Sequence, residues 1–145
     1  MAYNSLRLRV GMFGRLLREA LWAPLAIVLL AVAVGRLRAA EDLWWLVHVL
    51  GGAALAFCYL RAIDIGRAWL GALRAPAKYL LAFGLACTTA VGWEIGEFII
   101  DQLAGTALQE GNLDTMSDLI LGTGGAAAYL AWHALATHRN SGSGP

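Results

Sequence analysis

Residues 79–100 read YLLAFGLACTTAVGWEIGEFII, an apolar run long enough to cross a bilayer that nevertheless carries two glutamates near its end. A transmembrane helix needs about 20 consecutive, mainly apolar residues. No lysine or arginine occurs between Lys78 and Arg139, whereas six acids do: Glu94, Glu97, Asp101, Glu110, Asp114 and Asp118. A charged side chain at the centre of a membrane helix costs roughly 2.5–3.5 kcal/mol even on lenient insertion scales. These acids therefore need positive charge from a metal ion, a proton, a histidine or a distant arginine.

The composition of the whole chain is typical of an integral membrane protein. Of its 145 residues, 59% are hydrophobic and 14% are charged, against about 25% charged residues in soluble domains. The length suits one domain, residues 1–140, followed by a flexible tail or linker remnant at 141–145. The net charge of +1 gives no reason to expect nucleic acid as a partner. Cys58 and Cys87 lie in separate apolar segments and are interpreted as small hydrophobic residues.

Four apolar stretches predict an all-α integral membrane protein, a compact bundle of four transmembrane helices. We place the spans at about residues 20–35, 43–60, 79–100 and 115–136. The first span has an alternative interpretation as a cleaved signal peptide, because arginines precede its short apolar core.

The basic residues predict the orientation of the bundle. Nine of the eleven lie before the first span, between spans two and three, or after span four, and only Arg36 and Arg38 lie elsewhere. By the positive-inside rule both termini are cytoplasmic. Segments 1–18 and 61–78 are amphipathic and are expected to lie in the headgroup region. The expected location is the bacterial cytoplasmic (inner) membrane, with the lipid bilayer itself as a partner.

This orientation brings polar residues from three spans to the outer membrane surface. The acids of span three fall within about 60° of one another on one helix face. The residues expected to meet, and the predicted metal ligands, are His48, Glu94, Glu97, Asp101, Asp114 and Asp118.

Simpler interpretations stay open for several of these residues. Asp114 suits the N-cap of span four, Asp101 suits a solvated loop, and His48 suits a hydrogen bond to a backbone carbonyl. Glu94 and Glu97 fit no such role, because they lie near a helix C-terminus, where the helix dipole disfavours negative charge. We therefore predict that Glu94 and Glu97 are the catalytic pair if the protein is an enzyme.

Carboxylates with one imidazole suit a divalent ion, namely magnesium, manganese, iron, calcium or zinc, better than copper(I) or a thiolate zinc site. No organic cofactor is implied. The alternative is that Arg36 or Arg38 covers the acids as a lid. Glycines beside the polar residues of spans two to four predict close helix packing, with a homo-oligomer through a glycine-rich face as the second interpretation.

Three sequence pieces carry a resemblance to a known family. They are Asp42-Leu-x4-His48-x2-Gly51-Gly52, Trp93-Glu94-x2-Glu97-x3-Asp101 and Asp114-Thr-Met-Ser-Asp118-Leu, with Gly125-Ala126 following. The chain resembles the YjdF-like family of small bacterial inner-membrane proteins and, more loosely, VanZ-like proteins, which are associated with resistance to glycopeptide antibiotics. The resemblance implies a multi-pass membrane protein with a role at the cell envelope. It supports His48, Glu94, Glu97, Asp114 and Asp118 as a shared polar set without assigning roles.

Three functions are compatible with such a site. The first is a divalent-metal-dependent enzyme acting on a lipid-linked or cell-envelope substrate. The second is a non-catalytic membrane subunit with a structural metal or ion-pair site, and the third is a proton or divalent-cation carrier. The sequence contains no GxSxG, HExxH or Walker motif, so whether the protein is an enzyme rests on the acid cluster alone.

Overall fold

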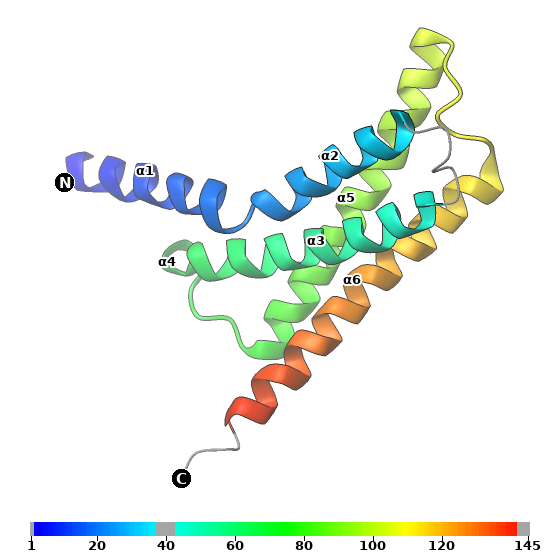
Figure 1. The fold of residues 1–145 in the computed structure, drawn as a ribbon. Helices are drawn as coiled ribbons and strands as arrows, with labels where there is room; N and C mark the ends of the chain where they lie inside the picture. The colour runs from blue at the N-terminus through cyan, green and yellow to red at the C-terminus, as the bar shows by residue number, and fades with distance from the viewer. Residues whose placement is uncertain (1, 37–42, 142–145) are drawn as a thin grey trace.

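The computed structural model describes residues 2–36 and 43–141, with side chains described for residues 11–36 and 43–139. All described elements are helices (Figure 1): α1 (Ala2–Glu19), α2 (Trp22–Arg36), α3 (Trp44–Ile65), the short α4 (Arg67–Leu70), α5 (Ala75–Ala104) and α6 (Asn112–Ser141). Three of these helices, α3, α5 and α6, are long and apolar enough to cross a membrane. The predicted all-helical membrane architecture is therefore confirmed for the described residues.

The first predicted span corresponds to α2, which is shorter than the other three. Its 15 residues measure about 22 Å at 1.5 Å per residue, less than the roughly 30 Å of a bilayer core. A fourth span results only if α2 is counted together with residues 11–19, and the helix axis bends by 44° between the two pieces. Pro24 lies in the first turn of α2, where proline is tolerated because no N–H is needed there. The side of the membrane on which each terminus lies stays a prediction.

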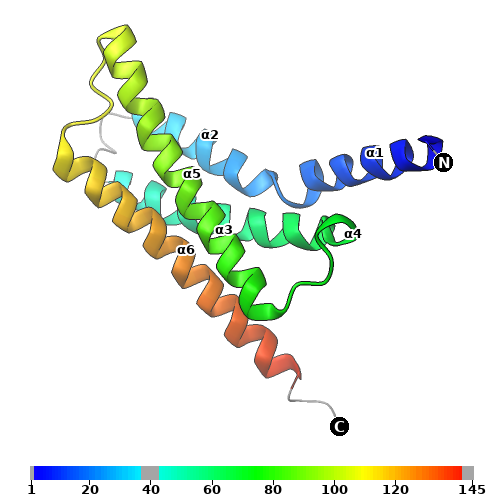
Figure 2. The same cartoon turned by 180° about the vertical axis from the view of Figure 1, so that it is seen from behind.

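Helix α3 occupies the centre of the protein and contacts α1, α2, α5 and α6 (Figures 1 and 2). Its small residues pack against similar residues of α5 and α6. The core consists of Ala56, Leu60, Ile63, Ala82, Ala86, Ala126 and Leu130. Large apolar side chains such as Leu80, 72% exposed, and Ile120, 67% exposed, point away from this core. Such outward apolar faces are what lipid-facing helices present.

Glycines set the distance between α3 and α6. A Cβ atom added at Gly52 would overlap the carbonyl oxygen of Gly122, and one added at Gly125 would overlap the carbonyl oxygen of Val49. The two backbones therefore touch directly, as the glycine content of these spans predicted. The same prediction was wrong for α5, where Gly92 and Gly96 have no atom within 4 Å of an added Cβ.

We expect Gly52→Ala to lower the free energy of unfolding by about 1–3 kcal/mol, the usual cost of overpacking a tight contact. Gly124→Ala is the matched control, because an added Cβ meets nothing within 4 Å there and alanine favours helix over glycine. Unfolding in mixed micelles, followed by circular dichroism, compares the variants. Equal stability of Gly52→Ala and the native chain would contradict the backbone contact.

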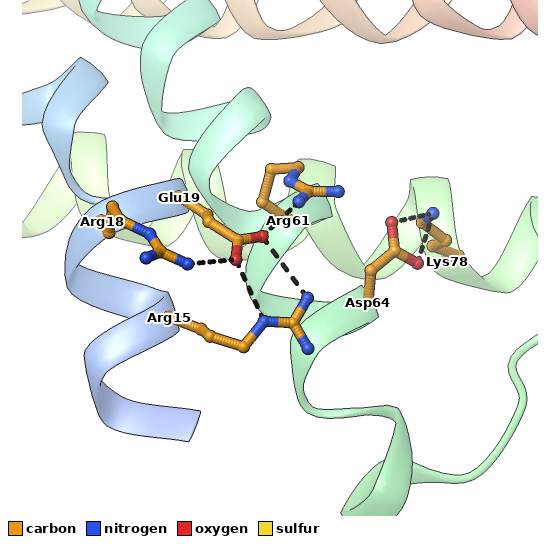
Figure 3. A network of polar contacts seen from close by, with 6 residues as sticks. All are labelled: Arg15, Arg18, Glu19, Arg61, Asp64 and Lys78. Carbon is orange, nitrogen blue, oxygen red and sulfur yellow. Dashed lines mark hydrogen bonds and ion pairs between the residues drawn. The ribbon is translucent and has the colours of Figure 1, made fainter. Parts of the chain in front are cut away.

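A cluster of ion pairs joins the helices at the end of α3 that lies away from its first turn (Figure 3). Glu19 accepts hydrogen bonds from Arg15 at 3.0 Å and from Arg61 at 2.6 Å, and it lies 3.5 Å from a nitrogen of Arg18. Lys78 donates to Asp64 at 2.7 Å. These contacts attach α1 and the start of α5 to the end of α3. Arg61 and Asp64 belong to α3 itself, so the predicted interfacial loop begins later than residue 61.

The cluster predicts a pH dependence of stability. Glu19 lies at the break between α1 and α2, outside the three spans, and its hydrogen bond from Arg15 is the main cause that lowers its pKa from 4.5 to about 2. A carboxyl group whose folded-state pKa is lowered stabilises the fold above its unfolded-state pKa and loses that contribution as the pH falls through the folded-state value.

Glu19→Gln is therefore expected to unfold at a lower temperature than the native chain at pH 7. The difference should shrink as the pH falls from about 4.5 toward 2. Glu110→Gln, at an exposed loop acid, is the control for removing one negative charge. A difference that stays constant over this pH range would show that Glu19 acts through packing and not through its charge.

Candidate metal centre

His48, Glu94 and Asp118 converge from three different helices, α3, α5 and α6. One ligand atom from each lies within 4.8 Å of the other two, and His48 Nε2 is 3.3 Å from an oxygen of Asp118. Glu94 is 6% exposed and is the one buried charged residue among those described. The His48 and Asp118 side chains are 18% and 15% exposed. The group is thus largely enclosed, and His48 and Asp118 are its more exposed members.

The glycine contact between α3 and α6 explains why His48 meets Asp118. His48 lies one helical turn before Gly52, and Asp118 lies one turn before Gly122. Side chains four residues apart share a helix face. Because the Gly52 and Gly122 backbones touch, the side chains one turn above them are brought together across the same interface.

Gln109 holds Glu94 in place from the loop between α5 and α6. Its Nε2 donates to the Glu94 carbonyl oxygen at 2.9 Å and to Glu94 Oε2 at 3.2 Å. Sequence reasoning did not find Gln109, because a single glutamine in a polar loop carries no pattern. Its role depends on the loop folding back over α5.

Asp101 holds the loop after α5 in the position in which it folds back over that helix. Helix α5 ends at Ala104, and Gly105 adopts a left-handed conformation with φ of 65°, which is the common helix-ending geometry for glycine. The Asp101 carboxylate then accepts hydrogen bonds from Thr106 Oγ1 at 2.6 Å, from Leu108 N at 2.8 Å and from Gln109 N at 3.0 Å. Asp101 therefore positions Gln109 and lies outside the group of three.

The other predicted residues occupy neighbouring positions. Glu97 lines the same cavity as the group of three and accepts a hydrogen bond from Trp93 Nε1 at 2.8 Å. Asp114 accepts one from the Glu110 N–H at 3.1 Å. Helix α6 begins at Asn112, so Asp114 lies in the first turn and is not the N-cap that the sequence suggested. Metal ligation by Glu97, Asp101 or Asp114 stays a prediction.

The group of three borders a cavity of about 530 Å³, within the roughly 300–1,000 Å³ typical of small-molecule sites. Residues of α2, α3, α5 and α6 line it, together with Leu108 of the loop. Most of the lining is apolar, for example Ile27, Val28, Ala31, Val47, Leu55 and Ala90. The ionisable lining residues are His48, Glu94, Glu97 and Asp118. The cavity is thus an apolar space with one acidic patch.

No lysine or arginine lines this cavity in the described part of the chain. Arg36 is exposed and forms no ion pair with another described residue, and Arg38 lies outside the described residues. The arginine lid that the sequence left open thus has no described contact with the acids.

The group of three can hold a divalent ion. Ligand atoms bound to one ion at about 2.0–2.2 Å lie at most about 4.4 Å apart, so three atoms within 4.8 Å need only small movements. One imidazole and two carboxylates match the preferences of manganese, iron and zinc, and leave coordination positions open.

The helices and their exposed apolar faces define a multi-pass α-helical membrane protein. A family model described as "Predicted membrane protein (DUF2238)" matches residues 13–139, and the chain belongs to this family. This is the YjdF-like family that the motifs around His48, Glu94 and Asp118 resemble. No curated protein and no solved structure matches the chain.

Asp101→Asn tests how the loop is held. The neutral amide accepts hydrogen bonds more weakly than a carboxylate does, because a hydrogen bond to a charged group is stronger than one to a neutral group. We expect amide hydrogen exchange in residues 105–111 to rise at least tenfold, while exchange in the middle of α3 stays unchanged. Glu110→Gln, in the same loop, serves as the control. Unchanged protection of the loop in Asp101→Asn would show that Asp101 does not hold it.

Proposed function

We propose that this protein is a divalent-metal-dependent enzyme of the bacterial inner membrane that acts on a lipid-linked or cell-envelope substrate. The observation that carries the proposal is the convergence of His48, Glu94 and Asp118 beside a cavity that no described lysine or arginine lines. Buried charges of one sign are retained in proteins when they are paired or coordinate a metal. His48 pairs partly with Asp118, and no lysine or arginine of the described chain forms an ion pair with Glu94 or Glu97.

The residues divide into two roles in this proposal. His48, Glu94 and Asp118 hold the ion, and Gln109 orients Glu94 through its two hydrogen bonds. Glu97 lies in the cavity but outside the group of three, and the Trp93 indole fixes one of its oxygens. It is therefore placed to accept a proton from water or substrate as a general base. A bound divalent ion supplies Lewis acidity toward a phosphoryl or carbonyl oxygen, or lowers the pKa of water.

A structural metal site in a non-catalytic subunit is the second candidate. This candidate is supported by the origin of the three residues in three helices, because one ion bound to them would link α3, α5 and α6. A cation carrier has less support, because the described residues further along the bundle offer hydroxyl and imidazole groups in separate pairs. Thr89 at the cavity wall is hydrogen-bonded to Tyr59, and His133 to Tyr79, whereas Thr123 donates to a carbonyl of its own helix.

Metal content of the full chain tests the site. The protein is purified in maltoside detergent without chelator, supplied with manganese, iron, zinc, magnesium and calcium, desalted and analysed for elements. We expect about one ion per chain in the native protein and in Glu110→Gln, and a loss of at least tenfold in the double variant Glu94→Gln/Asp118→Asn, because the remaining imidazole cannot hold a divalent ion alone.

Glu97→Gln separates the two roles, because it should keep the ion while removing the proton acceptor. An ion-free native protein, or an ion retained by the double variant, would overturn the metal site. Stripping the ion and measuring the unfolding temperature then separates the two candidates. A large drop in that temperature favours a structural ion, whereas a small drop favours a catalytic one.

A further inference from the structure

The cavity lies between two helices that do not pack against each other. Helix α2 packs on α1 and α3, and α5 packs on α3 and α6, with no direct packing between α2 and α5 in the described chain. Both helices nevertheless line the cavity, α2 through residues such as Val28 and α5 through residues such as Ala90. Helix α3 forms the floor through Val47 and Leu55. The cavity is therefore a groove over α3 with α2 and α5 as its two walls.

The outer surfaces of both walls are apolar. Leu25 and Leu29 of α2 are 59% and 71% exposed, and Ile95 and Ile99 of α5 are 54% and 49% exposed. In a membrane protein such surfaces face hydrocarbon. The side opening between α2 and α5 therefore faces the acyl chains of the bilayer and not water, so a ligand can enter the groove without leaving the membrane.

The two parts of the groove require two kinds of chemistry in one ligand. Burying a hydrocarbon chain in the apolar part leaves no polar group without a hydrogen bond, whereas burying polar groups there would cost free energy. The acidic patch of Glu94, Glu97 and Asp118 repels an anionic head unless a divalent ion lies between them. With an ion present, the best ligand is a hard oxygen anion, and phosphate is the oxygen anion that membrane lipids carry and that divalent ions commonly bridge.

We infer that the groove binds one hydrocarbon chain of a phosphate-bearing membrane lipid, which enters between α2 and α5, and that the ion held by His48, Glu94 and Asp118 bridges the lipid phosphate. The inference rests on the proposed metal site and specifies the substrate class of that site and the direction from which the substrate enters. The observation that supports it independently of the metal is the apolar groove between α2 and α5, two helices that do not pack against each other.

The test measures binding of dioctanoyl phosphatidic acid to the full chain in maltoside detergent, which carries no phosphate. Titrations are made with and without Mn²⁺, and Mn²⁺ binding is measured separately on every variant. Dioctanoyl glycerol supplies the chains without phosphate, and glycerol phosphate supplies the phosphate without chains. These two probes separate a lipid headgroup from free phosphate as the source of the ligand.

Val28→Trp fills the groove without touching the metal ligands. Val28 lines the groove and Val91 does not, while both are 44% exposed, so Val91→Trp is a matched control. Val32→Trp, one turn further along the same wall, is a second test of the same wall. Normal Mn²⁺ binding shows that each variant is folded.

We expect phosphatidic acid to bind at least tenfold more tightly with Mn²⁺ than without it. Both groove variants should weaken this binding at least tenfold, and Val91→Trp should leave it unchanged. Glycerol phosphate should bind weakly and be indifferent to all three substitutions.

Equal binding of phosphatidic acid to the native chain and both groove variants would overturn the inference while leaving the metal site intact. The same holds if dioctanoyl glycerol binds as tightly as phosphatidic acid, or if glycerol phosphate alone matches the lipid. If the native chain binds no Mn²⁺, the metal site itself is wrong, and the bridged phosphate is overturned with it.

Discussion

The direct backbone contact between α3 and α6 is the constraint on which the candidate site depends. Gly52 and Gly125 leave no room for a side chain on either helix, so the interaxial distance is set by the backbone. Membrane helices associate largely through such close packing, because lipid is as apolar as the side chains that it would replace. The contact lies one turn from both His48 and Asp118, and their separation of 3.3 Å follows from it. Helix α5 then adds Glu94 from the side, and the loop after α5 adds Gln109.

The ion-pair cluster around Arg61 and the group of His48, Glu94 and Asp118 lie at opposite ends of α3 and differ in their balance of charge. His48 and Arg61 are separated by thirteen residues, or about 20 Å along a helix. At the Arg61 end, both acids are paired with basic side chains, Glu19 with Arg61 and Asp64 with Lys78, and these contacts attach neighbouring helices to α3. At the His48 end, three acids share one imidazole, and no described lysine or arginine lines the cavity. Paired charges are typical of structural contacts, whereas acids that have no lysine or arginine beside them in the described chain mark where a ligand is expected.

The sequence predicted the helices well because the physical signal for each was long and local. Long apolar runs located α3, α5 and α6. Glu94 was expected near a helix end, on the unfavourable side of the dipole, but α5 continues for ten more residues to Ala104, beyond the reach of the dipole effect. What marks Glu94 as unusual is a carboxylate within an apolar run. The convergence of His48, Glu94 and Asp118 could also be expected from their common depth. Local signals could not separate these three from Asp101 and Asp114, because that distinction depends on the course of the loop at 105–111. Gln109 acquires its role only when Gly105 reverses the chain, and the open space around Gly92 and Gly96 depends on which face of α5 meets α3.

The order of the helices along the chain also governs when the site can exist during synthesis. Of the three helices that form the site, α3 with His48 leaves the ribosome first, α5 brings Glu94 later, and α6 supplies Asp118 and the glycine contact last. Glu94 must therefore enter the bilayer before the helix that completes its surroundings has been made. An emerging chain consequently holds an unassembled carboxylate at membrane depth, where α3 and α5 alone lack the close backbone contact that α6 provides. Insertion of α6 is thus the step that completes the group of three and encloses Glu94 between α3, α5 and α6.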